Sequence, residues 1–141
     1  MLTRLLYASR ATDNNRAAMT DSIMQQSKLH NPDRGITGIL CYGGDIFMQV
    51  LEGGRAEVNE LYGHILRDTR HCDVMILRYE EITERRFSGW TMGQVNLEKI
   101  NPAVLLKYSA HPTLDPYSVS GDVSMALLEE LISTAAIIGR V

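Results

Sequence analysis

The fold is decided by a stretch in the first half of the chain, residues 36–51, which reads ITGILCYGGDIFMQVL. Two apolar runs, residues 36–42 and 46–51, lie on either side of the glycine pair Gly43-Gly44. This pattern is typical of a β-hairpin, because glycine readily adopts the positive φ that tight hairpin turns require. The stretch therefore predicts two antiparallel strands that are neighbours in a sheet.

The sequence before this hairpin predicts one strand and one helix. Residues 2–8 form a short apolar run, which is typical of a strand. Residues 13–15, Asp-Asn-Asn, offer side-chain oxygens that can cap a helix running to about Leu29. We expect Pro32 to end this helix, since the residue before a proline is disfavoured in helical conformation.

The sequence after the hairpin begins with an amphipathic helix, because Val58, Leu61, Tyr62 and Ile65 recur at i, i+3, i+4 and i+7. The further elements predicted are strands at residues 74–79 and 89–95 and helices at residues 102–108 and 123–138. The order β-α-β-β-α-β-β is a ferredoxin-like α+β unit with one added strand. We therefore expect a five-stranded mixed sheet with two helices on one face.

The opposite face of that sheet also needs a cover. Strand alternation places Ile46, Met48 and Val50 on this face, and Leu6 on the first strand has the same parity. Large apolar patches are normally covered by another element or by a partner. The amphipathic residues 125–132 are the available cover, so we expect the C-terminal helices to pack there.

Composition excludes several classes of protein. The net charge of −3 and the absence of a basic cluster argue against direct nucleic-acid binding. No apolar run is long enough to cross a bilayer, and no signal-peptide pattern is present. The two cysteines and four histidines lack the spacing of a disulfide framework or a metal site. We expect a soluble, cytoplasmic protein without a metal, and a solvated loop at the charged residues 80–81 and 84–86.

One polar residue interrupts the apolar third strand. Alternation places Gln49 on the same face as Phe47 and Leu51, and every other residue from 46 to 51 is apolar. Strands one and three are central neighbours in a ferredoxin-like sheet, so Tyr7 could lie beside Gln49. Buried polar groups are normally hydrogen-bonded whether or not they act chemically. A satisfied core amide is therefore the plain alternative to a functional Gln49.

Several blocks of sequence resemble, in order and spacing, the BLUF (blue-light sensing using flavin) domain family. The blocks are Tyr7 with Ser9, then SKLHN at residues 27–31, GITG at 35–38, FMQVLEG at 47–53, RDTRH at 67–71 and RFSGWTMG at 86–93. Single blocks such as GITG have little specificity, but together they form a strong pattern. The resemblance extends from residue 2 to about residue 95.

This resemblance implies a flavin bound without a covalent link, usually FAD, with FMN and riboflavin as alternatives. The flavin would lie between the two helices and above the sheet. Asn31 would bond the polar edge of the isoalloxazine ring, and Gln49 would lie between that edge and the Tyr7 hydroxyl. The other implied positions are Ile23 and Ile65 on the ring faces, Ser27, His30, Asp68, Arg70 and His71 near the far side of the ring or the ribityl chain, and Trp90 and Met92 beside Gln49 on the fifth strand.

The implied function is a blue-light photoreceptor that is not an enzyme. Excited flavin would take an electron and a proton from Tyr7. Gln49 would relay the proton, then rotate or tautomerise and donate a stronger hydrogen bond to the flavin, which shifts absorption to the red. Residues 1–95 would be the photosensor domain and residues 96–141 a helical extension. A separate effector protein, or self-association into a dimer, would receive the signal.

Two other classes of function stay open at this point. One is a light-independent flavin-binding enzyme, since the ferredoxin-like fold supports many activities. The other is a flavin-free interaction module in which Gln49 is only a core amide. The colour of the purified protein separates the second class from the photoreceptor, and its response to blue light separates the first.

Overall fold

A computed structural model describes residues 1–133 and 139–140 of the chain. The strands are β1 (Leu2–Ala11), β2 (Thr37–Gly43), β3 (Ile46–Gly54), β4 (His71–Ile82), β5 (Gly93–Asn96) and β6 (Gly139–Arg140). The helices are α1 (Arg16–Arg34), α2 (Arg55–Arg67), the 3-10 turn η1 (Leu97–Lys99), α3 (Pro102–Leu106) and α4 (Gly121–Ser133). The fold is the expected ferredoxin-like α+β arrangement.

The strand order in the sheet is β4-β1-β3-β2-β5-β6. The sheet is mixed, because β2 and β5 are parallel whereas the other pairs are antiparallel. The two-residue β6 adds a sixth strand at the edge, next to β5, beyond the five that the sequence predicts. β1 and β3 are neighbours, and their register places Tyr7 opposite Gln49, as expected.

The predicted hairpin is confirmed as β2 and β3, paired from Thr37↔Glu52 to Gly43↔Ile46. The turn lies one residue later than predicted, at residues 44–45. Gly44 has φ 59°, a left-handed conformation that glycine adopts without steric cost. The glycine pair therefore marks the turn, although only its second member lies in it.

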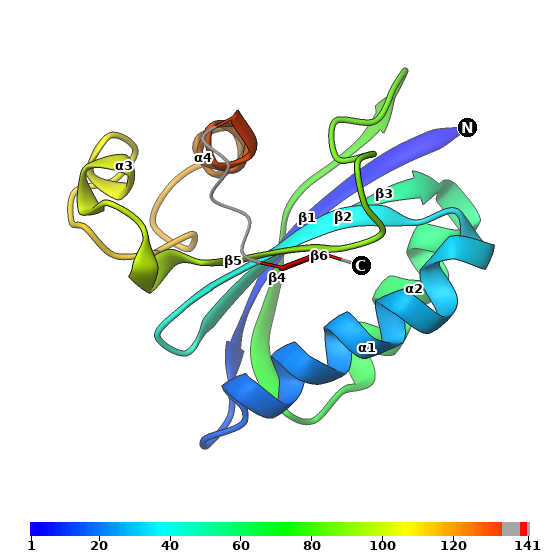
Figure 1. Ribbon diagram of the computed structural model, residues 1–141, viewed down its shortest axis with the longest axis horizontal. Helices are drawn as coiled ribbons and strands as arrows, with labels where there is room; N and C mark the ends of the chain where they lie inside the picture. The colour runs from blue at the N-terminus through cyan, green and yellow to red at the C-terminus, as the bar shows by residue number, and fades with distance from the viewer. Residues whose placement is uncertain (134–138, 141) are drawn as a thin grey trace.

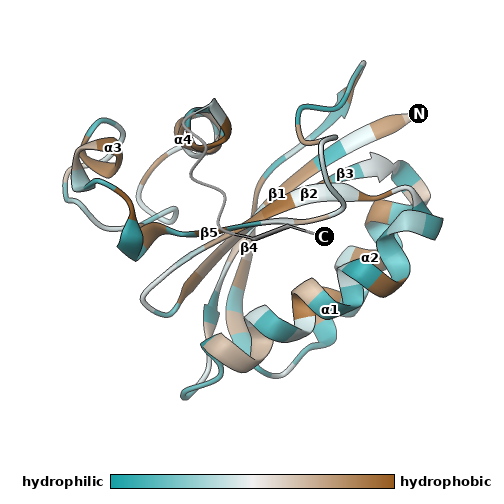
Figure 2. Ribbon diagram, viewed as in Figure 1, coloured by the Kyte–Doolittle hydropathy of each residue, from teal (hydrophilic) through white to brown (hydrophobic). Residues whose placement is uncertain are grey.

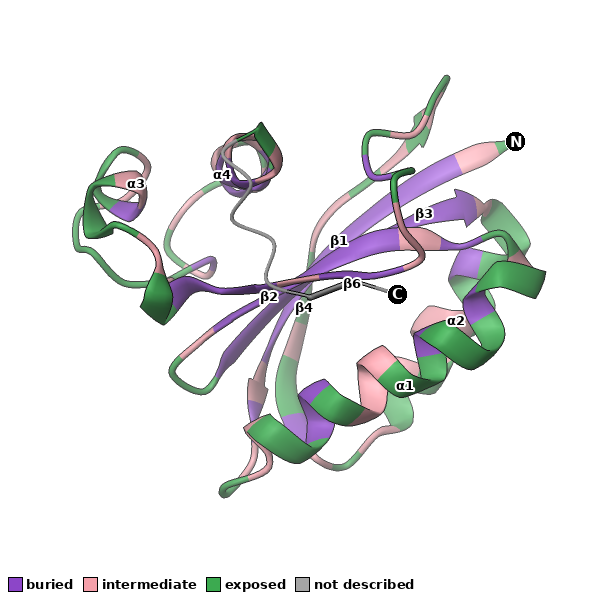
Figure 3. Cartoon of the chain, in the orientation of Figure 1, coloured by how far each residue is buried: buried purple, intermediate pink, exposed green. Residues whose placement is uncertain are grey.

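The sheet separates two layers of helix (Figure 1): α1 and α2 cover one face, and α3 and α4 lie over the other. The prediction that the C-terminal helices cover the second face is confirmed. Figure 2 shows hydrophobic residues on β1 and α4. Figure 3 shows that the central strands are buried, whereas β4 is a mixture of exposed and half-buried residues. The core between α4 and the sheet includes Leu6, Met48, Val50, Leu127, Leu128 and Leu131.

Helix α1 does not end before Pro32 as predicted, but continues to Arg34. Pro32 lies in the last turn, where its missing N–H leaves only one helical bond unmade. The helix ends instead at Gly35, which has φ 66°, and the Ile36 N–H donates to the Asn31 carbonyl. This glycine end satisfies the free carbonyls of the last turn. At the other end Asn15 is the N-cap residue, but its side chain makes no capping bond.

The fifth strand is shorter than predicted and begins only at Gly93. Residues 83–92 form an irregular loop between β4 and β5, so Trp90 and Met92 precede the strand and do not share a face of it. Glu80 and Glu81 lie on β4 and not in a loop as expected, whereas residues 84–86 lie in the loop, with Glu84 and Arg86 exposed. At the C-terminus, residues 134–138 of the predicted last helix lie outside the described residues.

None of the described helices has the length and hydropathy needed to span a membrane. In the described part of the chain, no three histidine, cysteine, aspartate or glutamate side chains lie together as metal ligands would.

Candidate functional site: a cavity between the first two helices

A cavity of about 340 Å³ lies between α1 and α2, with Gln49 of β3 among its lining residues. Its lining residues are Ser22, Ile23, Gln26, Ser27, His30, Asn31, Arg34, Gln49, Leu61, His64, Ile65, Asp68 and Arg70. Small-molecule pockets typically have volumes of about 300–1,000 Å³. The cavity can therefore hold one planar ring system.

Eight of the nine residues expected to bind a cofactor line this cavity. They are Ile23, Ser27, His30, Asn31, Gln49, Ile65, Asp68 and Arg70. The helical residues among them recur at spacings of three and four, which places them on one side of each helix. The same spacing extends to lining residues that the sequence interpretation missed, which are Ser22, Gln26, Arg34, Leu61 and His64.

His71, the ninth residue, does not line the cavity. Its Nδ1 lies 2.8 Å from the Ser9 Oγ, and its Nε2 lies 2.6 Å from the Ile65 carbonyl oxygen. Because a carbonyl can only accept, Nε2 donates, and the Nδ1 of a neutral ring accepts from the Ser9 hydroxyl. His71 therefore holds the end of α2 against β1.

Gln49 connects the cavity to Tyr7. The Tyr7 hydroxyl donates to the Gln49 Oε1 over 2.5 Å, and the Gln49 Nε2 donates to the Met92 sulfur over 3.4 Å. Tyr7 is fully buried and does not line the cavity. Gln49 is thus the side chain between a buried phenol and the cavity, with its amide bonded on both sides.

The buried position of Tyr7 keeps its hydroxyl protonated. Burial raises the pKa of Tyr7 far above its ordinary value, and the nearby Tyr62 and Asp68 raise it further. Burial disfavours the charged phenolate because a low-polarity environment solvates it poorly. Tyr7 is therefore a neutral hydrogen-bond donor at physiological pH.

Asn31 offers an unsatisfied donor at the cavity. The residue is 3 % exposed, and its Nδ2 has no hydrogen-bond partner among the described residues. A buried donor without a partner costs about 1–3 kcal/mol, so such groups are rare unless a ligand bonds them. Asn31 is suited to donate to a carbonyl group of a molecule in the cavity.

A charged pair borders the same cavity. The Arg70 guanidinium donates to both Asp68 oxygens, with an Nη2 to Oδ2 distance of 2.6 Å, and it also donates to the Ser22 hydroxyl. The Arg70 hydrogen bonds hold the pKa of Asp68 below its ordinary value. The pair thus presents a fixed polar surface, whereas Ile23 and Ile65 provide apolar surface.

Trp90 lies near this site without lining the cavity. Its Nε1 donates to the Gly38 carbonyl of β2 over 3.0 Å, and Met92 two residues later contacts Gln49. The structure therefore brings Met92 to Gln49, as expected, but from a loop and not from a strand.

The fold and this cavity define a ferredoxin-like domain with room for one planar small molecule beside a buried Tyr-Gln pair. Comparison with known proteins identifies its family. The family model "BLUF: Sensors of blue-light using FAD" matches residues 2–93, so the chain belongs to the BLUF family. It is a blue-light sensor domain, and flavin is the ligand of its family.

Named relatives agree with this assignment. The chain is 34% identical over 100 residues to photoactivated adenylate cyclase subunit beta of Euglena longa, and the match spans 70% of this chain but 12% of that protein. Among solved structures, the dark state of BlrB, a BLUF protein, matches with a TM-score of 0.78, 34% identity and coverage of 95% of this chain and 96% of that one. The photo-activated state of BlsA matches with a TM-score of 0.81, 29% identity and coverage of 94% and 95%.

Proposed function

We propose that the chain binds FAD in the cavity between α1 and α2 and reports blue light through the hydrogen bonds of Gln49. The observation that supports this most directly is the position of Gln49, which lines the cavity and bonds the Tyr7 hydroxyl on its other side. A satisfied core amide, the plain alternative, would have no reason to border a cavity of ligand size.

The residues of the cavity fit a flavin ring. Ile23 and Ile65 offer apolar surface to the ring faces, and the free Asn31 Nδ2 is available to a carbonyl oxygen at the ring edge. Ser27, His30 and the Arg70–Asp68 pair supply polar groups for the ribityl chain and the rest of the cofactor. FMN and riboflavin share the ring, so they would use the same contacts within the cavity.

When bound and excited, a flavin supplies a strong oxidant. Tyr7 is the buried side chain that would give an electron to the flavin, and its proton would pass along the existing hydrogen bond to the Gln49 Oε1 while the Gln49 amide relays a proton to the flavin. The electron and a proton would return to Tyr7 as the flavin relaxes. Gln49 then rotates or tautomerises, so that its amide donates toward the cavity. A stronger hydrogen bond to the chromophore in the excited state than in the ground state lowers the excitation energy and gives a red-shifted spectrum.

The signal leaves through the surface of the domain. In this proposal residues 1–95 are the photosensor domain, and residues 96–141 form the helical extension that meets a separate effector protein or a second copy. The Euglena longa relative is named as a cyclase subunit, and this chain spans 12% of its length. We therefore propose no cyclase activity for this chain.

An absorption spectrum before and after blue light tests the proposal. The purified protein should be yellow, release an intact flavin on denaturation, and show a red shift that reverses in the dark. A colourless protein that takes up no added FAD, FMN or riboflavin would contradict flavin binding. A yellow protein whose spectrum does not respond to light would instead support the light-independent enzyme.

A further inference from the structure

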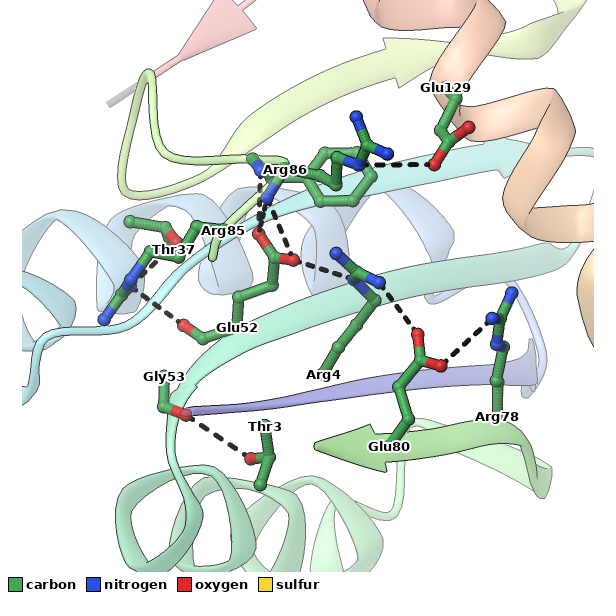
Figure 4. Close-up of polar contacts among 11 residues, drawn as sticks. Thr3, Arg4, Thr37, Glu52, Gly53, Arg78, Glu80, Arg85, Arg86 and Glu129 are labelled. Carbon is green, nitrogen blue, oxygen red and sulfur yellow. Dashed lines mark hydrogen bonds and ion pairs between the residues drawn. The ribbon is translucent and has the colours of Figure 1, made fainter. Parts of the chain in front are cut away.

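The carboxylate of Glu52 is fully buried and lies near the end of β3, three residues after Gln49. It accepts from the Arg4 Nε over 2.7 Å, from the Arg86 backbone N–H over 3.0 Å and from the Phe87 backbone N–H over 2.7 Å (Figure 4). A buried charge is costly unless it is paired and hydrogen-bonded, and here both conditions hold. Two of its three donors belong to the loop at residues 83–92, so the carboxylate fastens this loop to β3.

The anchored loop touches both layers of the molecule. The Phe87 side chain is buried in the core under α4, and the Arg86 Nε lies 3.7 Å from a Glu129 carboxylate oxygen on α4. Five residues after Phe87, the Met92 sulfur accepts the hydrogen bond from Gln49. A single ten-residue segment therefore connects Gln49 to the helix on the opposite face of the sheet.

Arg85 of the same loop makes a second set of hydrogen bonds that hold the loop in place. Arg85 donates to the Thr37 hydroxyl, to the Glu52 carbonyl and to the Gly35 carbonyl, over 2.9, 3.1 and 2.6 Å. The side chain and the carbonyl of Glu52 thus both bind the loop (Figure 4). With its start fixed in this way and its end held by the pairing of Gly93 with Ile39, the loop has little freedom to move Met92 away from Gln49.

We infer that Glu52 is a positioning residue: its carboxylate holds the 83–92 loop so that Met92 stays against the Gln49 amide and Arg86 stays beside α4. This inference rests on the proposed function, in which the Gln49 amide rearranges. The restraint opposes that rearrangement, because Gln49 must break its bond to a sulfur atom that cannot move with it. The same restraint favours the return, because the held sulfur is in place to accept the bond again. Because the loop is held as one unit, a displacement of Met92 would also displace Arg86 and Phe87, which lie against α4.

The first test uses the flavin-free protein, so it does not depend on photochemistry. Trp90 is the only tryptophan of the chain and lies in this loop, so its fluorescence reports the loop's position. In Glu52→Gln the negative charge is lost, and only one oxygen remains for the Arg4 Nε and the two loop N–H groups. We therefore expect Trp90 emission at longer wavelength with stronger acrylamide quenching. Glu80→Gln is the matched control, because Glu80 also binds Arg4 but makes no bond to the loop in the described structure. Equal Trp90 spectra for wild type, Glu52→Gln and Glu80→Gln would overturn the inference.

The second test measures dark recovery of the flavin-loaded protein. Glu52→Gln should recover about threefold more slowly, because a displaced Met92 must return before it can accept the Gln49 bond, and a small increase in barrier height produces a change of this size. In a Met92→Leu background, which removes the sulfur acceptor, Glu52→Gln should have little further effect, because the two changes act through one contact. Fully additive effects, or unchanged recovery with a displaced Trp90, would show that Glu52 holds the loop without positioning Gln49. If neither the wild type nor any variant binds flavin, the proposed function fails, but the fluorescence result for the flavin-free protein still stands.

A third measurement avoids the risk that Glu52→Gln does not fold. In the wild-type protein, amide hydrogen exchange of Arg86 and Phe87 should be slow, because the Glu52 carboxylate accepts both N–H groups. The exposed Ser88 and Gly89 that follow are the internal reference and should exchange fast. Fast exchange at Arg86 and Phe87 would contradict the anchor directly.

Discussion

At the scale of single residues, the Tyr7–Gln49 hydrogen bond is the feature on which the proposed photochemistry depends. Tyr7→Phe removes only the hydroxyl, and Gln49→Leu removes both amide functions at similar volume. We expect both variants to keep their flavin, because Tyr7 does not line the cavity and Gln49 is one of thirteen lining residues. Neither should show the light-induced red shift in a difference spectrum. A normal photocycle in Gln49→Leu would mean that the amide is not the relay.

Asn31 has a different predicted role, in binding alone. Asn31→Ala removes a donor that makes no bond within the described structure, so the flavin-free protein should not melt at a lower temperature. Its affinity for FAD should decrease about tenfold, the effect of losing one hydrogen bond of about 1.4 kcal/mol. Titration of the flavin-free protein with FAD measures this change. Gln26→Ala, which removes an exposed amide from the same cavity, is the control and should bind FAD almost as wild type.

The raised pKa of Tyr7 predicts how stability depends on pH. Above about pH 10 an unfolded tyrosine loses its proton while the buried Tyr7 keeps it, so the unfolded state is favoured as pH rises. Below about pH 10 Tyr7 is protonated in both the folded and the unfolded state, so no stability is lost there. Tyr7→Phe has no hydroxyl at this position and does not show this loss at any pH. Melting temperatures of the two proteins should therefore differ by a constant amount from pH 6 to 9 and move in favour of Tyr7→Phe at higher pH. A constant difference up to pH 11 would contradict the assigned cause.

Whether the position of a site residue can be predicted from the sequence depends on the groups that its side chain contacts. Tyr7 and Gln49 could be paired from strand alternation and strand order, because side-chain faces follow directly from parity. His71 could not be placed, since its two partners are a backbone carbonyl and a serine hydroxyl. The partners of Glu52 were equally hidden, because the backbone amides of an irregular loop leave no pattern in the sequence.

At the scale of elements, the end of α1 shows two local signals in competition. Pro32 alone indicates an end before residue 31, whereas Gly35 indicates an end after residue 34. Gly35 decides the end because its left-handed conformation allows the Ile36 N–H to close the last turn. The result matters for the site, because the cavity residues Asn31 and Arg34 lie in this additional turn.

Replacing this glycine should therefore destabilise the protein. Gly35→Ala places a Cβ in open space, with only the Arg85 side chain within 4 Å, so the cost arises from the left-handed φ and not from a clash. We expect the free energy of unfolding to decrease by about 1–2 kcal/mol, measured by urea denaturation. Gly89→Ala is the control, because Gly89 has neither a positive φ nor a nearby atom. Equal losses in both variants would mean that the α1 end contributes nothing specific.

At the scale of the whole molecule, the layered arrangement was the most predictable feature. The sheet has two apolar faces, and the chain contains two sets of helices, so each set covers one face. The periodicity of the apolar residues and the order of the elements gave this result, because burial of apolar faces determines the layers before any side-chain detail does. The unusual loop at residues 83–92 was not predictable in the same way, because its shape depends on specific hydrogen bonds.

The cover formed by α4 gives a prediction for the intact fold. Removing residues 97–141 exposes the apolar face that Leu6, Met48 and Val50 share, and such a face normally binds another surface. We expect the shortened protein to self-associate in sedimentation velocity while it still binds flavin, because the cavity residues all lie between Ser22 and Arg70. Truncation after Ser133 is the matched control, because it retains the whole of α4 and should not expose this face. A protein shortened after Asn96 that sediments no differently from this control would show that α4 is not needed to protect the sheet, and the route from the loop to α4 would then lose its structural basis.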